Sequence, residues 1–99
     1  MAAVSKAVTR EVLTRTWTCD SKLRNGNRVT VRVAIPDGMK YISHSVEIIS
    51  EEGKVEVSPG ALDREGKYPE VVATITAWKR TFKNSAATAE INVVVERLS

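Results

Sequence analysis

The sequence predicts an all-β fold: a small antiparallel β-sandwich or barrel of about six strands that ends in a long C-terminal hairpin. Three observations predict it. Apolar and polar residues alternate in several short segments, turn residues separate those segments, and the apolar residues are mostly Val, Ala and Ile. Alternation with a period of two places successive side chains on opposite faces of a strand. β-Branched side chains also fit a pleated surface better than a helix.

The 99 residues are expected to form a single β domain, residues 1–99, because so short a chain cannot divide into two well-buried cores. Hydrophobic residues make up 42% of the chain and charged residues 27%, as in folded proteins rather than disordered ones. Lys6, Arg10 and Glu11 stand where a signal peptide needs an apolar core, and no apolar run could span a membrane. We therefore expect cytoplasmic synthesis without a signal peptide, which is compatible with a place in an assembled particle.

The N-terminal segment, about residues 1–8, is expected to be a mobile or loosely docked tail. Val4, Val8 and Val12 recur every fourth residue, as on a helix. Val and Thr are poor helix formers, however, and a helix this short is marginal by itself. We favour a tail that runs into a strand at about Val8.

The first strand is expected within Glu11–Cys19, and the second at Arg28–Ile35. An Asn-Gly pair in Arg24–Asn27 is typical of a tight hairpin turn, which would join the two strands. The second strand has the cleanest alternation in the chain and ends at Pro36–Gly38. On the first strand Leu13, Trp17 and Cys19 share one face, which Arg15 interrupts, and Val12 and three threonines share the other, so both faces are expected to be partly covered. The residues of the second strand expected to face inward are Val29, Val31, Val33 and Ile35.

A third strand is expected at Tyr41–Ser50 and a brief fourth at Val55–Val57. The inward set of the third strand is expected to be Ile42, His44, Val46 and Ile48. Ser58–Pro69 contains two prolines and two glycines, so it is predicted to be the one long loop.

The last two strands, 71–78 and 87–96, are predicted to pair as the C-terminal hairpin. Asn and Ser in the segment 83–86 favour a reversal of the chain between them. A lone hairpin is marginally stable, so its apolar face must pack against further strands. That face is expected to hold Ala73, Ile75, Ala77, Ala89, Ile91, Val93 and Val95.

Motifs for catalysis or cofactor binding do not stand out. The single histidine, His44, lies on the apolar side of its strand, where a hydrogen-bonded structural role is favoured over a general base. One Cys and one His cannot complete a zinc site, and neither a GxGxxG nor a Walker-type sequence occurs. We therefore expect a protein that is not an enzyme and that uses no metal and no cofactor.

The strongest candidate site is an outward-facing group formed by Trp78, Arg80 and Phe82. If Ile75 and Ala77 point into the core, the same pleat sends these three side chains outward. Exposed aromatic groups usually mark contacts with partners, and Trp and Arg are enriched among binding hot spots. The alternative is that the long loop and the N-terminal segment cover Trp78 inside a monomer.

Nucleic acid is the main alternative partner. A basic stripe with a tryptophan for base stacking could form from Arg15, Trp17, Arg28 and Arg32. The net charge is only +3, however, and the sequence lacks the paired aromatic signature of RNA-recognition sheets, so weak binding is expected. A carbohydrate bound on an exposed tryptophan is a further alternative.

The charges are distributed unevenly along the chain. Residues 1–35 hold seven basic and two acidic side chains, residues 36–70 hold four and eight, and residues 71–99 hold four and two. A dipolar molecule would suit contacts with copies of itself, although a folded surface can also intermix these charges. The sequence therefore predicts a structural or interaction module that acts through protein contacts, by self-assembly or by docking onto a larger particle or appendage.

Overall fold

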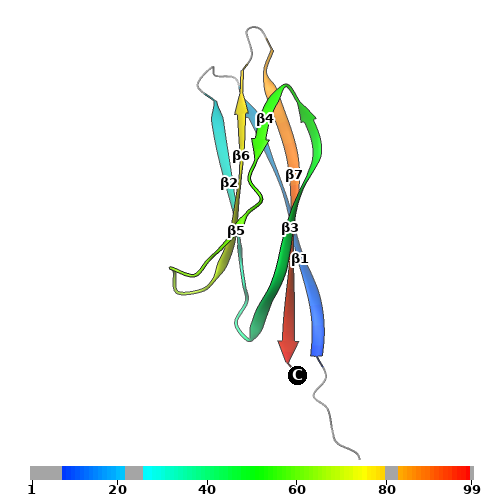
Figure 1. The fold of residues 1–99 in the computed structure, drawn as a ribbon, viewed down its shortest axis with the longest axis vertical. Helices are drawn as coiled ribbons and strands as arrows, with labels where there is room; N and C mark the ends of the chain where they lie inside the picture. The colour runs from blue at the N-terminus through cyan, green and yellow to red at the C-terminus, as the bar shows by residue number, and fades with distance from the viewer. Residues whose placement is uncertain (1–7, 22–25, 80–82, 99) are drawn as a thin grey trace, which may run out of the picture.

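The computed structural model describes residues 8–21, 26–79 and 83–98, which form seven β-strands and no helix (Figure 1). The strands are β1 (Val8–Ser21), β2 (Asn27–Ala34), β3 (Met39–Glu52), β4 (Lys54–Val57), β5 (Ala61–Asp63), β6 (Glu70–Trp78) and β7 (Ser85–Leu98). They form two antiparallel sheets that do not close into a barrel. The all-β prediction is confirmed.

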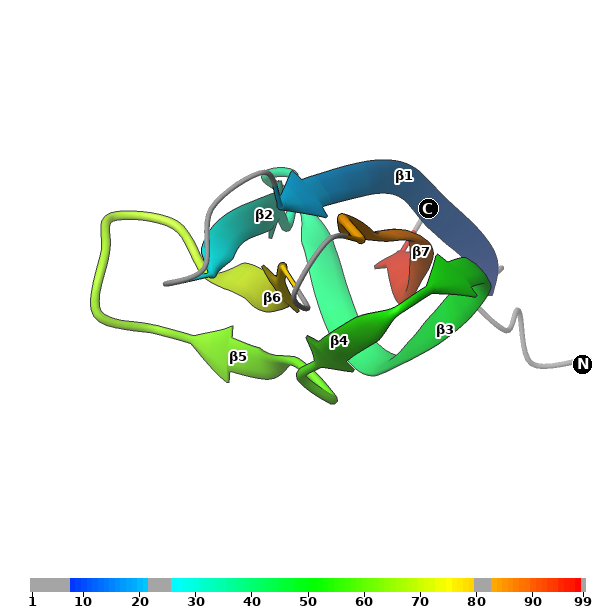
Figure 2. The ribbon, with the colours of Figure 1, turned by 90° about the horizontal axis from the view of Figure 1, so that it is seen from above.

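Each sheet is built around one central strand. The β7 sheet has the order β1–β7–β3, and the β6 sheet has the order β2–β6–β4, with β5 also paired to β6. Figure 2, which views the molecule down its long axis, shows these two groups of strands. Three strands have 14 residues each, and at about 3.4 Å per residue each of them is roughly 45 Å long, which explains the elongated shape in Figure 1.

The core lies between the sheets and comes mainly from the two central strands. Every second residue is buried in β6 from Val71 to Ala77 and in β7 from Ser85 to Val95. The remaining buried apolar residues come from β1 and from the end of β2 and the residue after it: Trp17, Cys19, Val33 and Ile35. The inward faces predicted for the last two strands are confirmed.

The predicted C-terminal hairpin is wrong, because β6 and β7 belong to different sheets. Ile75 of β6 lies opposite Val29 of β2, whereas Ile91 of β7 lies opposite Arg15 of β1 and Val46 of β3. An alternating strand buries the same apolar face whether the next strand pairs beside it or packs across the core. The pattern therefore identified the buried faces but not the partners.

The hairpin predicted at Arg24–Asn27 is wrong for the same reason, since β1 and β2 also lie in different sheets. Part of that segment lies outside the described residues. The turn predicted at Pro36–Gly38 is confirmed. The Met39 N–H donates to the carbonyl of Pro36 at 3.2 Å, and Gly38 has a φ of +79°, in the left-handed region that favours glycine.

The third strand is longer than predicted and has two bulges in its pairing with β7, one after Tyr41 and one after Ile48. A bulge inserts one residue, so the residues on its two sides change their relation to the faces of the sheet. As a result Tyr41, and not Ile42, packs against the core together with Val46. The predicted inward position of Ile42 is therefore wrong, and Ile48, also predicted to face inward, is 45% exposed.

One strand that the sequence does not predict, β5, lies inside the segment predicted to be one long loop. Leu62 of β5 pairs with Val71 of β6 and packs against the core. A run of three residues is too short for alternation to identify it as a strand. The predicted count of about six strands is one too few.

Candidate functional site

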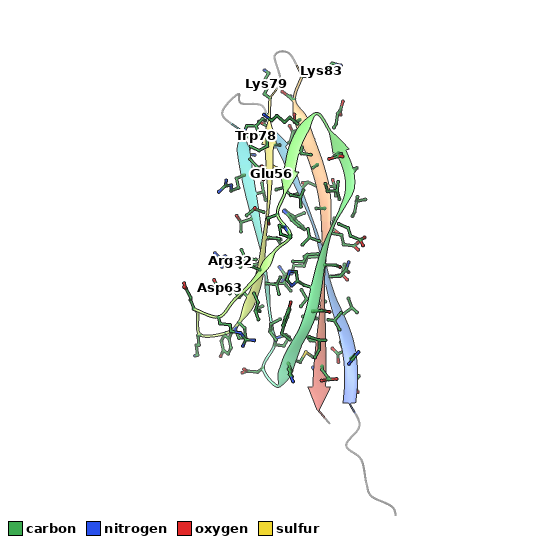
Figure 3. All side chains as sticks on the ribbon, in the orientation of Figure 1. Arg32, Glu56, Asp63, Trp78, Lys79 and Lys83 are labelled. Atoms are coloured by element: carbon green, nitrogen blue, oxygen red, sulfur yellow. The ribbon has the colours of Figure 1, made fainter. Side chains whose placement is uncertain are left out.

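Trp78 is the last residue of β6 and lies on the outer face of the β6 sheet. The alternation of the strand places Ile75 and Ala77 in the core and sends Thr76 and Trp78 to the other side. The indole is half-buried. It is therefore neither fully exposed nor fully covered inside the monomer, the two alternatives considered from the sequence. Figure 3 shows Trp78 near one end of the molecule, the end where Lys79 and Lys83 also lie.

Two neighbours hold the indole of Trp78 against the sheet. On β4, Lys54 pairs with Trp78 in the register, and its Nζ lies 5.2 Å from the ring centroid, a cation–π contact. On the other side, a Cβ built on Gly26 would lie 2.7 Å from Cδ1 of the ring. Gly26 also has a φ of +84°. A glycine at this position therefore lets the indole lie directly against the backbone.

Ser85 connects this pair to the other sheet. Its hydroxyl accepts a hydrogen bond from the backbone N–H of Lys54 at 2.7 Å and donates one to the backbone carbonyl of Trp78. The side chain of Ser85 is fully buried at the start of β7. The sequence indicated only a turn residue at this position, and no local signal distinguishes a turn serine from one that joins two sheets.

The outer face beyond Trp78 is polar. In the next row of the register, Thr76 lies between Arg28 on β2 and Glu56 on β4, and Nε of Arg28 donates to its hydroxyl at 3.4 Å. Towards the other end, Nη1 of Arg32 lies 3.7 Å from a carboxylate oxygen of Asp63, in an exposed ion pair. Figure 3 shows Arg32 and Asp63 well away from Trp78.

Several basic side chains lie at the end of the molecule around Trp78. Figure 3 shows Lys79 and Lys83 at this end with Glu56 further along, and Lys54 lies over the indole. Glu51 and Glu52 of β3 lie at the same end, opposite Ala87 and Ala86. Within the described residues, none of the ion pairs involves any of these three lysines. We call Trp78, Lys54, Lys79, Lys83 and Arg28 the Trp78 surface. Its positive charges are thus available to an external partner.

The other two members of the predicted group, Arg80 and Phe82, lie outside the described residues. The structure therefore locates only Trp78 of the three. Lys54 and Gly26, which hold the ring, were not identified from the sequence, because they are brought to Trp78 from other strands.

The structure does not bring the residues of the predicted nucleic-acid stripe onto one face. Trp17 is 8% exposed and belongs to the core, so its ring is not available for stacking. Arg28 and Arg32 lie on the outer face of the β6 sheet, whereas Arg15 is an exposed residue of β1 in the other sheet. Nε1 of Trp17 has no hydrogen-bond partner among the described residues.

His44 links β3 to the segment that follows β4. Nε2 lies 3.1 Å from the carbonyl oxygen of Pro59, which can only accept, so Nε2 is the donor. In the neutral ring Nδ1 then accepts from the hydroxyl of Tyr41, 2.5 Å away. The bulge after Tyr41 makes this contact feasible, because residues three apart on a regular strand face opposite sides.

Replacing His44 by Gln is expected to lower the free energy of unfolding by about 1 kcal/mol, since the new side chain cannot maintain both hydrogen bonds. For a domain of this size that corresponds to a fall in Tm of about 4–8 °C. Thermal unfolding followed by circular dichroism measures it, with Tyr41→Phe as the control that removes only one of the bonds. Unchanged stability combined with lost assembly would instead make His44 a functional residue.

The one cysteine, Cys19, is buried in β1. Its Sγ donates to the carbonyl of Asn27 at 3.3 Å. Burial raises the pKa of the Cys19 thiol, which favours the unreactive protonated form. Among the described residues no group of three or more His, Cys, Asp or Glu side chains is arranged to hold a metal ion.

Comparisons with known proteins found no match to a family model, a curated protein or a solved structure. The residues that the structure describes contain no helix long and apolar enough to cross a membrane.

Proposed function

We propose that this chain is a β-sandwich module that works by contact with other protein chains rather than by catalysis, through self-assembly or docking onto a larger assembly. The Trp78 surface is the proposed contact. The observation that supports it most is the way the indole is held in place. Gly26 and Lys54 contact the ring, and Ser85 holds the backbone of both Lys54 and Trp78.

A fixed aromatic ring suits a contact surface because binding then costs little conformational entropy. Large aromatic side chains at the centre of an interface contribute most of the binding energy in many complexes. Apart from Val72 and Ala34, the rest of the outer face of the β6 sheet carries threonines and paired or exposed charges. Trp78 is therefore the natural anchor on this face, with the lysines as its charged rim.

Lys54 also favours protein over a base or a sugar as the partner. Its ammonium group already lies over the indole ring, so a flat ligand would have to displace it in order to stack there. A protein partner that brings a carboxylate can pair with Lys54 where it lies. Arg28, Lys79 and Lys83 would attract such a partner in the same way.

Trp78→Ala is expected to weaken self-association at least tenfold, because the variant loses the anchor of the contact. The cost to the free energy of unfolding should be about 1–2 kcal/mol, since the variant loses the cation–π contact and the burial of a half-buried indole. Sedimentation velocity over a range of concentrations measures the first effect, and urea unfolding the second.

Val12→Ala is the matched control, because Val12 is 58% exposed on the outer face of the other sheet. It should leave both quantities unchanged. If Trp78→Ala assembles like the wild type, the Trp78 surface is not the contact. If instead it unfolds as readily as a core variant, Trp78 belongs to the core.

Binding to nucleic acid, the alternative that the basic side chains around Trp78 suggest, is expected to be weak and to depend strongly on salt. Contacts to phosphates alone give a log affinity that falls linearly with log salt concentration. Fluorescence anisotropy of a labelled single-stranded oligonucleotide should show binding at low salt that is lost by about 150 mM, where the Debye length is about 8 Å. Tight, sequence-selective binding at that salt would make nucleic acid the better proposal.

A further inference from the structure

The end of β3 carries a second unusual surface. Ile48 and Ile49 are 45% and 56% exposed, and they are two of the four large hydrophobic residues that the described part of the chain exposes. Glu47, Glu51 and Glu52 flank them and are exposed as well. We call these five residues the β3 tip. It combines two isoleucines with three carboxylates: Glu51 lies on the same side of the sheet as Ile48, opposite Ala87, and Glu47 and Glu52 lie on the other side, opposite Glu90 and Ala86.

The position of β3 explains the exposure. β3 pairs only with β7 and is an edge strand of its sheet. The bulge between Ile48 and Ser50 interrupts the ladder there, so Ile49 has no partner across the strand. Isoleucines beside each other at a bulge of an edge strand are not needed for the core, and exposed apolar groups of this kind usually mark a contact.

The charges of the β3 tip are also unused within the chain. Among the described residues no ion pair includes Glu47, Glu51 or Glu52. The Trp78 surface has the opposite composition, an aromatic centre with lysines around it that are likewise unpaired. The two surfaces thus match each other in charge and in apolar character.

We propose that the β3 tip of one copy of this chain binds the Trp78 surface of a second copy, an inference that rests on the proposed function above. The isoleucines would pack against the part of the indole that Lys54 leaves uncovered, and the carboxylates would pair with Lys54, Lys79 and Lys83. Within one chain the two surfaces adjoin, since Lys54 follows Glu52 after one residue, but among the described residues no ion pair joins them, so both remain open to a second copy.

Such a contact can be made twice in a two-fold dimer, in which the β3 tip of each copy binds the Trp78 surface of the other, provided that both surfaces lie at the same end of the molecule. Both surfaces lie at the same end of the molecule. Glu52 pairs with Ala86 of β7, next to Ser85, whose hydroxyl bonds to the backbone of Trp78. Each copy would therefore use this end for both contacts and leave the opposite end free.

A mixing experiment tests the proposal. Trp78→Ala removes the anchor of one surface, and Ile49→Asp places a charge in the centre of the other, at an exposed position where folding should not suffer. Each variant alone is expected to self-associate at least tenfold more weakly than the wild type. An equimolar mixture still contains one intact surface of each kind, so it should form a dimer and stop there, as measured by sedimentation velocity.

Charge reversal gives a second, independent readout. Lys54→Glu and Glu51→Lys are each expected to weaken association, and the double variant, which carries both changes, should recover a large part of it. The outcomes separate the two proposals. If Trp78→Ala disrupts assembly while Ile49→Asp does not, or if the mixture fails to form a dimer, the β3 tip is not the partner and the Trp78 surface remains the contact. A wild-type chain that stays at 10.9 kDa at all concentrations overturns the pairing of copies altogether.

Discussion

Ile91→Ala is expected to lower the free energy of unfolding by about 2–5 kcal/mol, the range seen for large-to-small changes in tightly packed cores. Ile91 is fully buried in the middle of β7, the central strand of its sheet. Strands β1 and β3 flank it, and the β6 sheet covers it. The cavity can therefore not collapse without moving several strands. Small domains are stable by only about 5–15 kcal/mol, so this one change removes a large share.

Ile49→Ala is the matched control, with the same truncation at a residue that is 56% exposed. It should change the free energy of unfolding by no more than about 0.5 kcal/mol. Urea unfolding at a concentration where the chain is monomeric measures both variants. If the two cost the same, the packing of the two sheets around β7 is not the source of stability.

Gly53→Ala is expected to cost about 2–5 kcal/mol. Gly53 has a φ of +79°, a conformation that costs an L-residue about 1–2 kcal/mol. A Cβ there would also overlap the hydroxyl of Ser85 and lie 3.0 Å from its Cα. Displacing Ser85 breaks its buried hydrogen bonds to Lys54 and Trp78, at a further cost of about 1–3 kcal/mol.

Gly38→Ala separates these two contributions. Gly38 has the same φ of +79°, but nothing lies within 4 Å of the Cβ that the change adds. It should therefore show only the backbone cost, and the difference between the two variants measures the Ser85 contact. Equal losses of stability in chemical denaturation would mean that Ser85 does not hold the two sheets together at this end.

The sequence predicted which face of a strand is buried better than it predicted which strands pair with each other. The inward residues of β6 and β7 were identified correctly because alternation reports directly on burial. Their predicted pairing in a hairpin was wrong. Two consecutive strands show the same alternation whether they pair within one sheet or face each other across the core. The Asn-Gly pair between the first two strands was misleading for a related reason: it predicts that the chain reverses, and not which sheet it enters next.

The candidate site was predicted only in outline. The outward position of Trp78 followed from the register, and the structure confirms that orientation. Its half-buried state depends on Gly26 and Lys54, which are far from it in sequence, and on a hydrogen bond from Ser85. The sequence does not predict the bulges either, since the residues around the one after Ile48 carry no local signal for it. Contacts between distant strands leave no periodic pattern in a single sequence.

The most direct test of the proposed contact uses the two tryptophans of the chain as internal probes. Each indole N–H gives one resolved resonance in a ¹H–¹⁵N NMR spectrum, and Trp78→Phe assigns the pair. As the protein concentration rises, the resonance of Trp78 is expected to shift or broaden, while that of Trp17, buried in the core, stays in place. If the Trp78 resonance is unchanged over the whole range while the chain associates, or if the Trp17 resonance moves in its place, the Trp78 surface is not where the copies meet.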